Sequence, residues 1–465
     1  MKKIVFAVSM VALLGALPAS AQLDLSRYVA LGDQLTAGFT SSGLVDCYQS
    51  HSFPAVLAAQ AGVATFEMPL MSPPGIPPIL ELVSLAGGVP TLAYAGDPAD
   101  AFPYNATYPL PYNNLGVPGA TLYDMLFTTG DINNVLSGNT DNAMHDLILR
   151  VPQVPNPVTG ELMDFTAIVQ AIALDPTFVT LWIGFNDVLG AVTSGTPIEG
   201  VTMTPVSVFG TLYPQAVGTL VQATDANIVL FTLPDPTETA FMTTLPPFLN
   251  ITGLGVVPIM GSNGPLPADA RVSLLASSLL AQGYGVPLPG YPPLPEDVNL
   301  ITGTPGYVLR AEEISFLKDR VAEFNAIIVQ TADAFGLPVF DAGALIDRAN
   351  FGEGFVFGGV HLDGSYLTGG LVGYDSVHPQ QLGYAVIAMY LIDFLNETYG
   401  ADIAPFNLSE ILFDNPCAPL VPPPYGVDAK SIQFSPEAAD SFLELFMPEL
   451  PRVLPHDQEA AAATD

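Results

Sequence analysis

The chain has 465 residues, of which 49% are hydrophobic and only 12% are charged, so it has ample apolar material for a large core. Acidic residues number 45 against 11 basic ones, which gives a formal net charge of -34. A chain so acidic repels phosphate, so we expect no nucleic-acid partner, and binding to an anionic membrane surface is disfavoured.

Residues 1–21 have the pattern of an export signal. Met1-Lys2-Lys3 precedes an apolar run from Ile4 to Pro18, and Ala19-Ser20-Ala21 follows as an A-x-A cleavage motif. The alternative, a transmembrane anchor, is disfavoured because the run is short for a bilayer. We therefore expect cleavage before Gln22 and a secreted or periplasmic protein without a transmembrane anchor.

Short apolar strands then alternate with helical patterns along the chain. The expected strands are 28–31, 178–183, 227–232 and 337–341, and the expected helices run from about 311 to 335 and from about 379 to 399. This alternation is typical of a parallel sheet covered by helices on both faces. We predict an α/β fold over residues 22–400, a three-layer α/β/α sandwich with a central, mostly parallel sheet.

Two long segments interrupt this alternation, near 68–112 and 236–306, and both are rich in Pro, Gly, Leu and Tyr. Loops of this length are often lids or binding surfaces, and the alternative is that they only elaborate the surface. If they border a cleft, their many apolar residues favour a lipid or medium-chain acyl ester as ligand. These residues could equally pack on one another. Residues 401–465 are expected to form a C-terminal extension and tail.

Cys47 and Cys417 are the only cysteines of the chain. An even number in an exported protein favours a disulfide, which would tie the N-terminal loop to the C-terminal extension. Two unpaired thiols are the alternative. Two cysteines cannot complete a structural zinc site, and histidines are few and unclustered, so we expect neither a metal nor another cofactor. His361 could be a ligand or a second base, or an ordinary loop residue, and His51 could pack near the site opening or elsewhere.

Four segments carry side chains that could take part in catalysis or binding. Three of these segments follow a strand or open a helix, which is where open parallel sheets place their sites. The four segments are Gly32-Asp33-Gln34-Leu35, Asn114–Ala120, Gly184-Phe185-Asn186-Asp187 and Asp375-Ser376-Val377-His378-Pro379. A carboxylate at position 375 can hold one nitrogen of His378 while the other nitrogen takes a proton. The N–H of Gly116 and the amide of Asn186 are suitable donors to a developing oxyanion.

Together, in this order, the four segments resemble the sequence blocks of the GDSL, or SGNH, hydrolase family of esterases and lipases, and the likeness extends to about Tyr399. The resemblance implies a flavodoxin-like fold and a cleft shaped for carboxylic esters. It also implies that Gly116 and Asn186 help form the oxyanion hole and that His378 is a general base oriented by Asp375.

The family's nucleophilic serine falls on Gln34. A carboxamide has no usable nucleophilic electron pair at neutral pH, so a serine-type acyl-enzyme cannot form at this position. Other hydroxyl groups nearby in sequence are those of Thr36, Ser41, Ser42 and Ser376. They are poor substitutes for the serine because none is expected to lie where it could attack an ester next to His378.

Two functions therefore stay open. The first is a hydrolase-family protein with weak or altered ester hydrolysis, in which His378 activates water directly. The second is a non-catalytic protein that binds an acyl or other hydrophobic ligand. A third function, a surface protein that associates through its insertions, would predict that several of the site residues are lost. The sequence retains them. The oligomeric state stays open.

Overall fold

The structure, a computed structural model, describes residues 23–84, 90–97, 100–351, 353–406, 408, 443, 445 and 446. The predicted export signal, Cys417 and most of the predicted C-terminal extension and tail lie outside the described residues.

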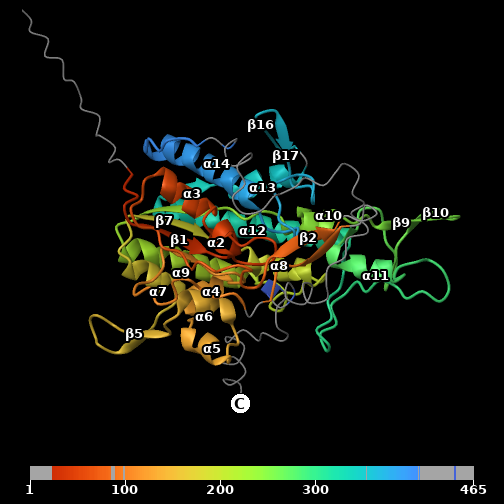
Figure 1. Cartoon of the computed structure of the whole chain (residues 1–465), viewed down its shortest axis with the longest axis horizontal. Coiled ribbons are helices and arrows are strands. Elements are labelled where there is room, and N and C mark those ends of the chain that lie inside the picture. The colour runs from red at the N-terminus through yellow and green to blue at the C-terminus, as the bar shows by residue number, and fades with distance from the viewer. Residues whose placement is uncertain are drawn as a thin grey trace, which may run out of the picture.

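A parallel sheet of five strands lies at the centre of the fold (Figure 1). Its strands lie in the order β15-β8-β7-β1-β4, and each neighbouring pair is parallel. Their bounds are β1 (Tyr28–Gly32), β4 (Asn114–Gly116), β7 (Phe178–Trp182), β8 (Asn227–Phe231) and β15 (Val339–Phe340). This is the flavodoxin-like order, so the predicted α/β fold with a parallel sheet is confirmed. The short strand β4 was not expected from the sequence.

Helices cover both faces of this sheet (Figure 1). On one face α14 (Gln381–Tyr399) packs against α3 (Phe53–Gln60). On the other face α9 (Val206–Ala223) contacts both α7 (Ala167–Ala173) and α12 (Ala311–Phe335). The result is the predicted arrangement of three layers, in which each strand of the sheet centre is buried on both sides.

Aromatic side chains fill the space between sheet and helices. The Phe53 ring, from α3, lies 5.6 Å from the Trp182 ring and 5.5 Å from the Phe231 ring. On the opposite face Phe209 of α9 stacks on Phe324 of α12 with 4.1 Å between ring centroids. Large buried rings of this kind contribute strongly to core stability, and they fix the strand ends that carry the site.

The long helix predicted over 311–335 is observed as Ala311–Phe335, and Gly336 closes it in the left-handed conformation at φ 68. The last helix begins at Gln381 rather than at the predicted 379. Pro379 instead forms an antiparallel bridge with Val372. This bridge holds the segment containing His378 outside the helix.

The remaining elements are short. The other helices are α1 (Gln34–Ala37), α2 (Asp46–Gln49), α4 (Leu122–Phe127), α5 (Ile132–Ser137), α6 (Ala143–Leu149), α8 (Asn186–Thr193), α10 (Ala240–Thr243), α11 (Ser277–Ala281) and α13 (Ala342–Asn350), with 3-10 turns η3 (Pro236–Glu238) and η4 (Leu274–Ala276). The other strands form two-stranded antiparallel pairs: β2 (Leu80–Ser84) with β3 (Thr91–Tyr94), β5 (Gln153–Pro155) with β6 (Leu162–Asp164), β9 (Phe248–Ile251) with β10 (Gly255–Pro258), β11 (Met260–Gly261) with β12 (Gly264–Pro265), β13 (Arg271–Val272) with β14 (Val308–Leu309), and β16 (Phe355–Phe357) with β17 (Val360–Leu362).

Both predicted insertions contain hairpins of this kind and are pinned to the sandwich by cations. The guanidinium of Arg150, just after α6, donates to backbone carbonyls of the first insertion at Ala106, Tyr108 and Leu110. In the second insertion Glu238 pairs with Lys318 of α12, 2.5 Å away. Both insertions are therefore ordered segments that are held against the sandwich by hydrogen bonds and ion pairs.

Candidate active site

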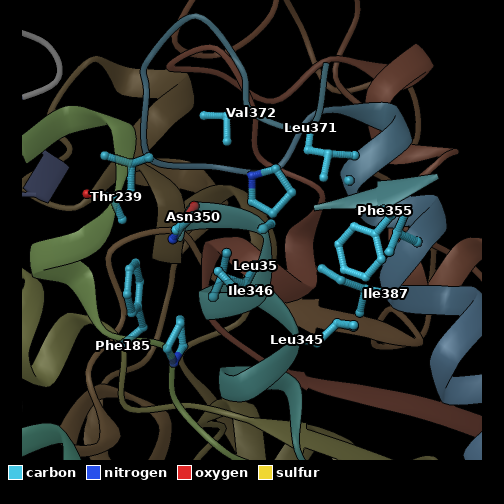
Figure 2. A pocket seen from close by; sticks show the side chains of 16 residues that line it. Leu35, Phe185, Thr239, Leu345, Ile346, Asn350, Phe355, Leu371, Val372 and Ile387 are labelled. Atoms are coloured by element: carbon cyan, nitrogen blue, oxygen red, sulfur yellow. The ribbon is translucent and has the colours of Figure 1, made fainter. Parts of the chain in front are cut away.

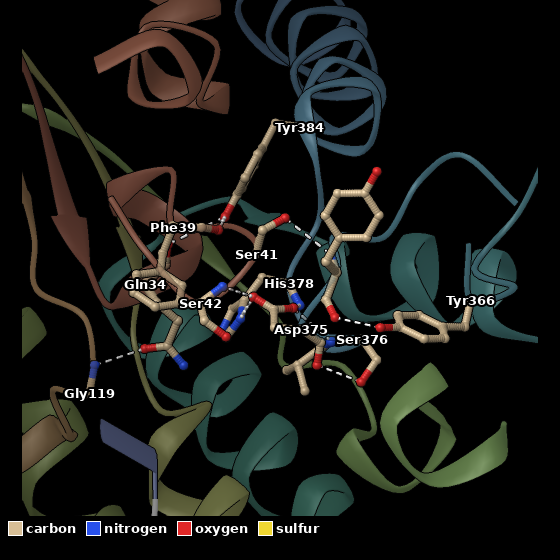
Figure 3. A network of polar contacts seen from close by, with 12 residues as sticks. Gln34, Phe39, Ser41, Ser42, Gly119, Tyr366, Asp375, Ser376, His378 and Tyr384 are labelled. Atoms are coloured by element: carbon tan, nitrogen blue, oxygen red, sulfur yellow. Dashed lines mark hydrogen bonds and ion pairs between the residues drawn. The ribbon is translucent and has the colours of Figure 1, made fainter. Parts of the chain in front are cut away.

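The site forms where parallel strands end at one edge of the sheet. Gln34 follows β1 after Asp33, and Asn186 opens α8 shortly after β7. Because the carboxyl ends of parallel strands share an edge, these two residues, 152 positions apart in sequence, come into hydrogen-bond contact. Figure 3 shows Gln34 in one polar network with Asp375 and His378.

The carboxamide of Gln34 bonds protein partners through both its oxygen and its nitrogen. Its Oε1 accepts from Asn186 Nδ2 at 2.7 Å and from the Gly119 N–H at 3.1 Å. Its Nε2 donates to Asn186 Oδ1 at 2.7 Å. Two backbone groups fix the orientation of both amides, since Asn186 Nδ2 must also face the Ala120 carbonyl at 2.7 Å and Gln34 Oε1 must face the Gly119 N–H.

These two donors are the kind that stabilise an oxyanion in acyl transfer. In this chain an internal oxygen, Gln34 Oε1, takes them. Both donors are therefore already paired with a neutral carbonyl group of the protein itself.

The predicted role of Gly116 needs a correction. Its N–H donates to Asn114 Oδ1 at 2.9 Å, so this N–H is not directed at a reacting group. A Cβ at position 116 would lie 2.4 Å from the Ala37 nitrogen, so glycine is required here for the close approach of β4 to α1. The donor in the pocket is Gly119, at φ 81. A Pro-Gly turn before the helix cap Thr121 was the sequence signal for it.

His378 and Asp375 form the predicted pair. His378 Nδ1 lies 2.9 Å from Asp375 Oδ2, and both side chains are fully buried. The backbone N–H groups of Ser42, Val377 and His378 also donate to the Asp375 carboxylate. Burial alone would raise the pKa of Asp375, but the imidazole of His378 and these hydrogen bonds hold it below its ordinary value. Asp375 therefore stays ionised and fixes the ring orientation.

The second nitrogen of the ring, His378 Nε2, is buried without a hydrogen-bond partner. A general base needs such a free nitrogen. The Phe39 ring packs edge-on against the imidazole at 4.9 Å between centroids, and the Phe39 N–H donates to the Gln34 carbonyl. Phe39 thus links the histidine to the turn that carries Gln34.

The nearby hydroxyl groups do not reach His378 Nε2. Ser42 contacts Asp375 through its backbone N–H, which is the Nδ1 side of the ring. Ser376 Oγ donates to the Asp375 carbonyl, and Ser41 Oγ accepts from the Tyr374 N–H. The Thr36 hydroxyl lies against Gly32 at the end of β1. In the described site no serine or threonine hydroxyl has the position of a nucleophile toward this nitrogen.

Two further carboxyl groups are buried behind the amide pair. Burial raises the pKa of Asp33 to about 8 and that of Asp187 to about 7, and each carboxyl group interacts with other buried acids. Asp33 Oδ1 caps α1 by accepting from the Leu35 N–H at 3.0 Å. Asp187 Oδ2 accepts from the Leu122 N–H at 2.9 Å. The base of the pocket is therefore held together by carboxyl groups that are neutral at moderately acidic pH.

This placement predicts that stability falls as the pH rises. An Asp with a pKa near 8 in the folded state and near 4 in the unfolded state binds more protons when the chain is folded. The free energy of unfolding therefore decreases as the pH rises from about 4 to about 8. Asp33→Asn keeps the cap acceptor and removes the titration. We expect the fall in Tm between pH 5 and 9 to be smaller in Asp33→Asn than in wild type, on the order of a few degrees. Asp175→Asn, at a largely exposed carboxylate, is the control, and equal slopes in all three proteins would contradict the prediction.

The lesser candidates lie apart from this network. His361 pairs with Asp363 at 3.3 Å on a half-exposed surface, and His51 Nδ1 bonds the Cys47 carbonyl at 2.7 Å. Among the described residues no group of three or more His, Cys, Asp and Glu side chains is placed to hold a metal ion. Cys47 is disulfide-bonded, while Cys417 lies outside the described residues.

A mainly apolar pocket lies beside the site, between α13 and α14 (Figure 2). Leu35, Phe185 and Val377, which line it, directly adjoin Gln34, Asn186 and His378 in sequence. The other lining residues are mainly aliphatic or aromatic, among them Leu345, Ile346, Phe355, Leu371 and Ile387. From the two predicted insertions only Thr239 takes part, so this pocket is built chiefly by the sandwich itself.

The insertions do touch the loops that carry the site. The Phe241 N–H, in α10, donates to the Ser376 carbonyl at 2.9 Å, between Asp375 and His378. The Leu80 N–H, at the start of β2, donates to the Ser41 carbonyl at 2.7 Å. Both insertions therefore support the site loops.

Comparison with known protein families identifies the family of this chain. The family model described as GDSL-like Lipase/Acylhydrolase matches residues 28–391. The chain belongs to this family of lipases and acylhydrolases. No sequence among the curated proteins matches it.

Within the described part of the chain, no helix combines the length and apolarity needed to cross a bilayer.

Two solved structures are distantly similar. One is LAE5, an α/β hydrolase enzyme from the metagenome of Lake Arreo in Spain, with 12% identity and a TM-score of 0.34 over 79% of this chain and 94% of that chain. The other is phospholipase A1 from Streptomyces albidoflavus NA297, with 14% identity and a TM-score of 0.29 over 79% of this chain and 98% of that chain. At these scores the likeness carries no argument about substrate.

Proposed function

We propose that this chain is a GDSL-family protein that binds an acyl or other hydrophobic ligand and has lost serine-type ester hydrolysis. The observation that carries the proposal is the state of the Gln34 carboxamide. It follows β1 at the position where the family's serine is expected, and its Oε1 takes the hydrogen bonds of Asn186 and Gly119. An ester carbonyl would have to displace this oxygen, and no nucleophile would then attack it.

The retained base supports a weak residual route as the second candidate. Asp375 holds His378 so that Nε2 is free, and a neutral imidazole can take a proton from water. Such a route lacks a covalent step and has its oxyanion donors occupied, so its rate is expected to be low. The two candidates differ in rate while sharing the same cleft.

The ligand class follows from the surroundings of the site. The pocket next to Leu35, Phe185 and Val377 has a mainly apolar lining. Concave sites lined mainly by apolar side chains with a few polar groups are typical of small apolar ligands. We therefore infer a lipid or medium-chain acyl group as the ligand, with its carbonyl directed toward the buried donors.

The same proposal includes export. The pattern of residues 1–21 favours removal before Gln22 and a secreted or periplasmic location. The disulfide at Cys47 supports an oxidising compartment. A sandwich over residues 22–400 with a C-terminal extension is the proposed organisation of the mature chain.

Assays on the wild-type chain test this function. We expect turnover of p-nitrophenyl esters close to that of free imidazole, and no labelling by a serine-directed fluorophosphonate, because no hydroxyl group stands at the reacting position. Rapid labelling would contradict the proposal. Strong turnover that survives Gln34→Ala but is lost in His378→Ala would favour the water route instead.

A further inference from the structure

The C-terminal segment returns to the site from more than 60 positions beyond His378. The Phe446 ring lies 4.9 Å from the His378 ring and 5.6 Å from the Phe39 ring, between centroids. The three rings thus pack against one another, and the imidazole contacts one phenyl ring from the turn after α1 and one from the C-terminal segment. Phe446 is 5% exposed, so its side chain is inserted rather than resting on the surface.

The same segment also contacts the helix that carries Asn186. Thr193, the last residue of α8, donates from Oγ1 to the Phe446 carbonyl at 2.9 Å. Asn186 is the first residue of that helix. The backbone of the C-terminal segment is therefore held by the same short helix that presents the amide of the site.

A third contact reaches the remaining donor. The Leu445 carbonyl oxygen lies 3.1 Å, and its Cδ1 3.4 Å, from the point where a Cβ on Gly119 would stand. Leu445 therefore covers the residue whose N–H donates to Gln34. Leu443 and Leu445 also pack against the main hydrophobic core. Leu445 and Phe446 therefore lie against one donor residue of the site, Gly119, and against the candidate base, His378.

The side chains of the candidate site are buried. Gln34 and His378 are each 0% exposed, although a binding or catalytic site must admit its ligand. Phe39 is fixed to the body of the fold, since its carbonyl accepts from the Tyr384 hydroxyl at 2.7 Å. Leu445 and Phe446 belong neither to the central sheet nor to the helices that cover it, so they can move away without disturbing either.

We propose that Leu445 and Phe446 form a built-in plug over Gly119 and His378, which must be displaced before the carbonyl group of a ligand reaches His378. The plug has an apolar side chain beside a carbonyl group, which are the two features of an acyl ligand. This inference deepens the proposed function and rests on it for the identity of the ligand, but the closure itself is independent of the ligand. The wild-type chain is thus autoinhibited in cis.

Chemical modification of His378 tests the plug without any ligand. Diethyl pyrocarbonate acylates a free imidazole nitrogen, and mass spectrometry of peptides reports each histidine separately. In the wild-type chain we expect slow modification of His378 and fast modification of the half-exposed His361. In Phe446→Ala we expect the His378 rate to rise about tenfold or more, because opening of the local cover limits the reaction.

Controls separate opening of the plug from general unfolding. Phe316→Ala, at a partly exposed ring on α12, should leave the His378 rate unchanged, and the buried His145 should stay protected in every variant. If His145 becomes reactive in Phe446→Ala, that variant has unfolded more widely, and the His378 rate is then measured in Thr193→Val. This substitution removes the hydrogen bond to the Phe446 carbonyl and keeps the core intact. His378 as reactive as His361 in wild type, or unchanged in both variants, would overturn the plug.

Ligand binding then separates the plug from the proposed function. A fluorescent long-chain fatty acid, cis-parinaric acid, should bind more tightly to Phe446→Ala than to wild type. Faster modification of His378 without fatty-acid binding in any variant would support the plug and contradict an acyl ligand. A synthetic peptide of residues 441–450, added to Phe446→Ala, should restore slow modification of His378.

Discussion

Gln34→Ser is expected to hydrolyse activated short-chain esters roughly 10³-fold faster than the wild-type chain, or more, because it adds a nucleophile to machinery that is otherwise in place. Removal of the carboxamide would release Asn186 Nδ2 and the Gly119 N–H for the oxyanion. His378, whose Nε2 has no hydrogen-bond partner, is the proposed base for the new serine. Initial rates with p-nitrophenyl acetate and butyrate measure the change.

The matched control is Gln34→Ala, which also frees the two donors but supplies no nucleophile. Its rate should stay near that of wild type, so the gain is assigned to the hydroxyl group. Both substitutions are also combined with Phe446→Ala, because the Phe446 ring covers His378 and would limit access of the ester. Inactivity of Gln34→Ser in both backgrounds would mean that the loop of His378 no longer has a catalytic position relative to residue 34.

His378→Ala is expected to remove the activity gained by Gln34→Ser, by about 10³-fold or more, because the new serine would lose its base. Asp375 would then be a buried carboxylate without its imidazole partner, so Tm is measured alongside the rate. Comparison of kcat and KM for butyrate esters should place the loss mainly in kcat.

His361→Ala provides a matched control for this variant. His361 also pairs with a carboxylate, Asp363, at 3.3 Å, but on the surface. The Gln34→Ser/His361→Ala protein should keep the activity of Gln34→Ser. Equal losses in the two histidine variants would contradict the assignment of His378 as the base.

Under the proposed function, the hydrogen bonds of Gln34 account for a family member that keeps the residues of its site without the nucleophile. Serine has a short side chain that leaves the oxyanion donors open, whereas the longer glutamine side chain reaches them with its own carbonyl oxygen. The pairing of Gln34 with Asn186 satisfies polar groups that would otherwise be buried without partners, which is costly. Asn186, Gly119 and Asp187 therefore retain structural roles even when no ester is bound.

The sequence by itself determined the parallel sheet, the helix over 311–335 and the pairing of Asp375 with His378. Continuous apolar runs predict strands buried on both faces, and helical periodicity extends over many residues. The Asp375 and His378 side chains are close because they are three positions apart in one loop, so local spacing was sufficient. The neighbourhood of Gln34 and Asn186 followed from their place after parallel strands.

Only the tertiary structure decided which glycine supplies the donor and what covers the base. Gly116 and Gly119 lie in one short segment, and their N–H directions depend on how β4 packs on α1, which no local pattern specifies. The Gln34 carboxamide bonds Asn186, which lies 152 positions away in sequence. The Phe446 ring contacts His378, so the C-terminal segment meets the last loop before α14. Such contacts depend on the packing of distant segments, where side-chain shape and burial outweigh the preferences of the local sequence.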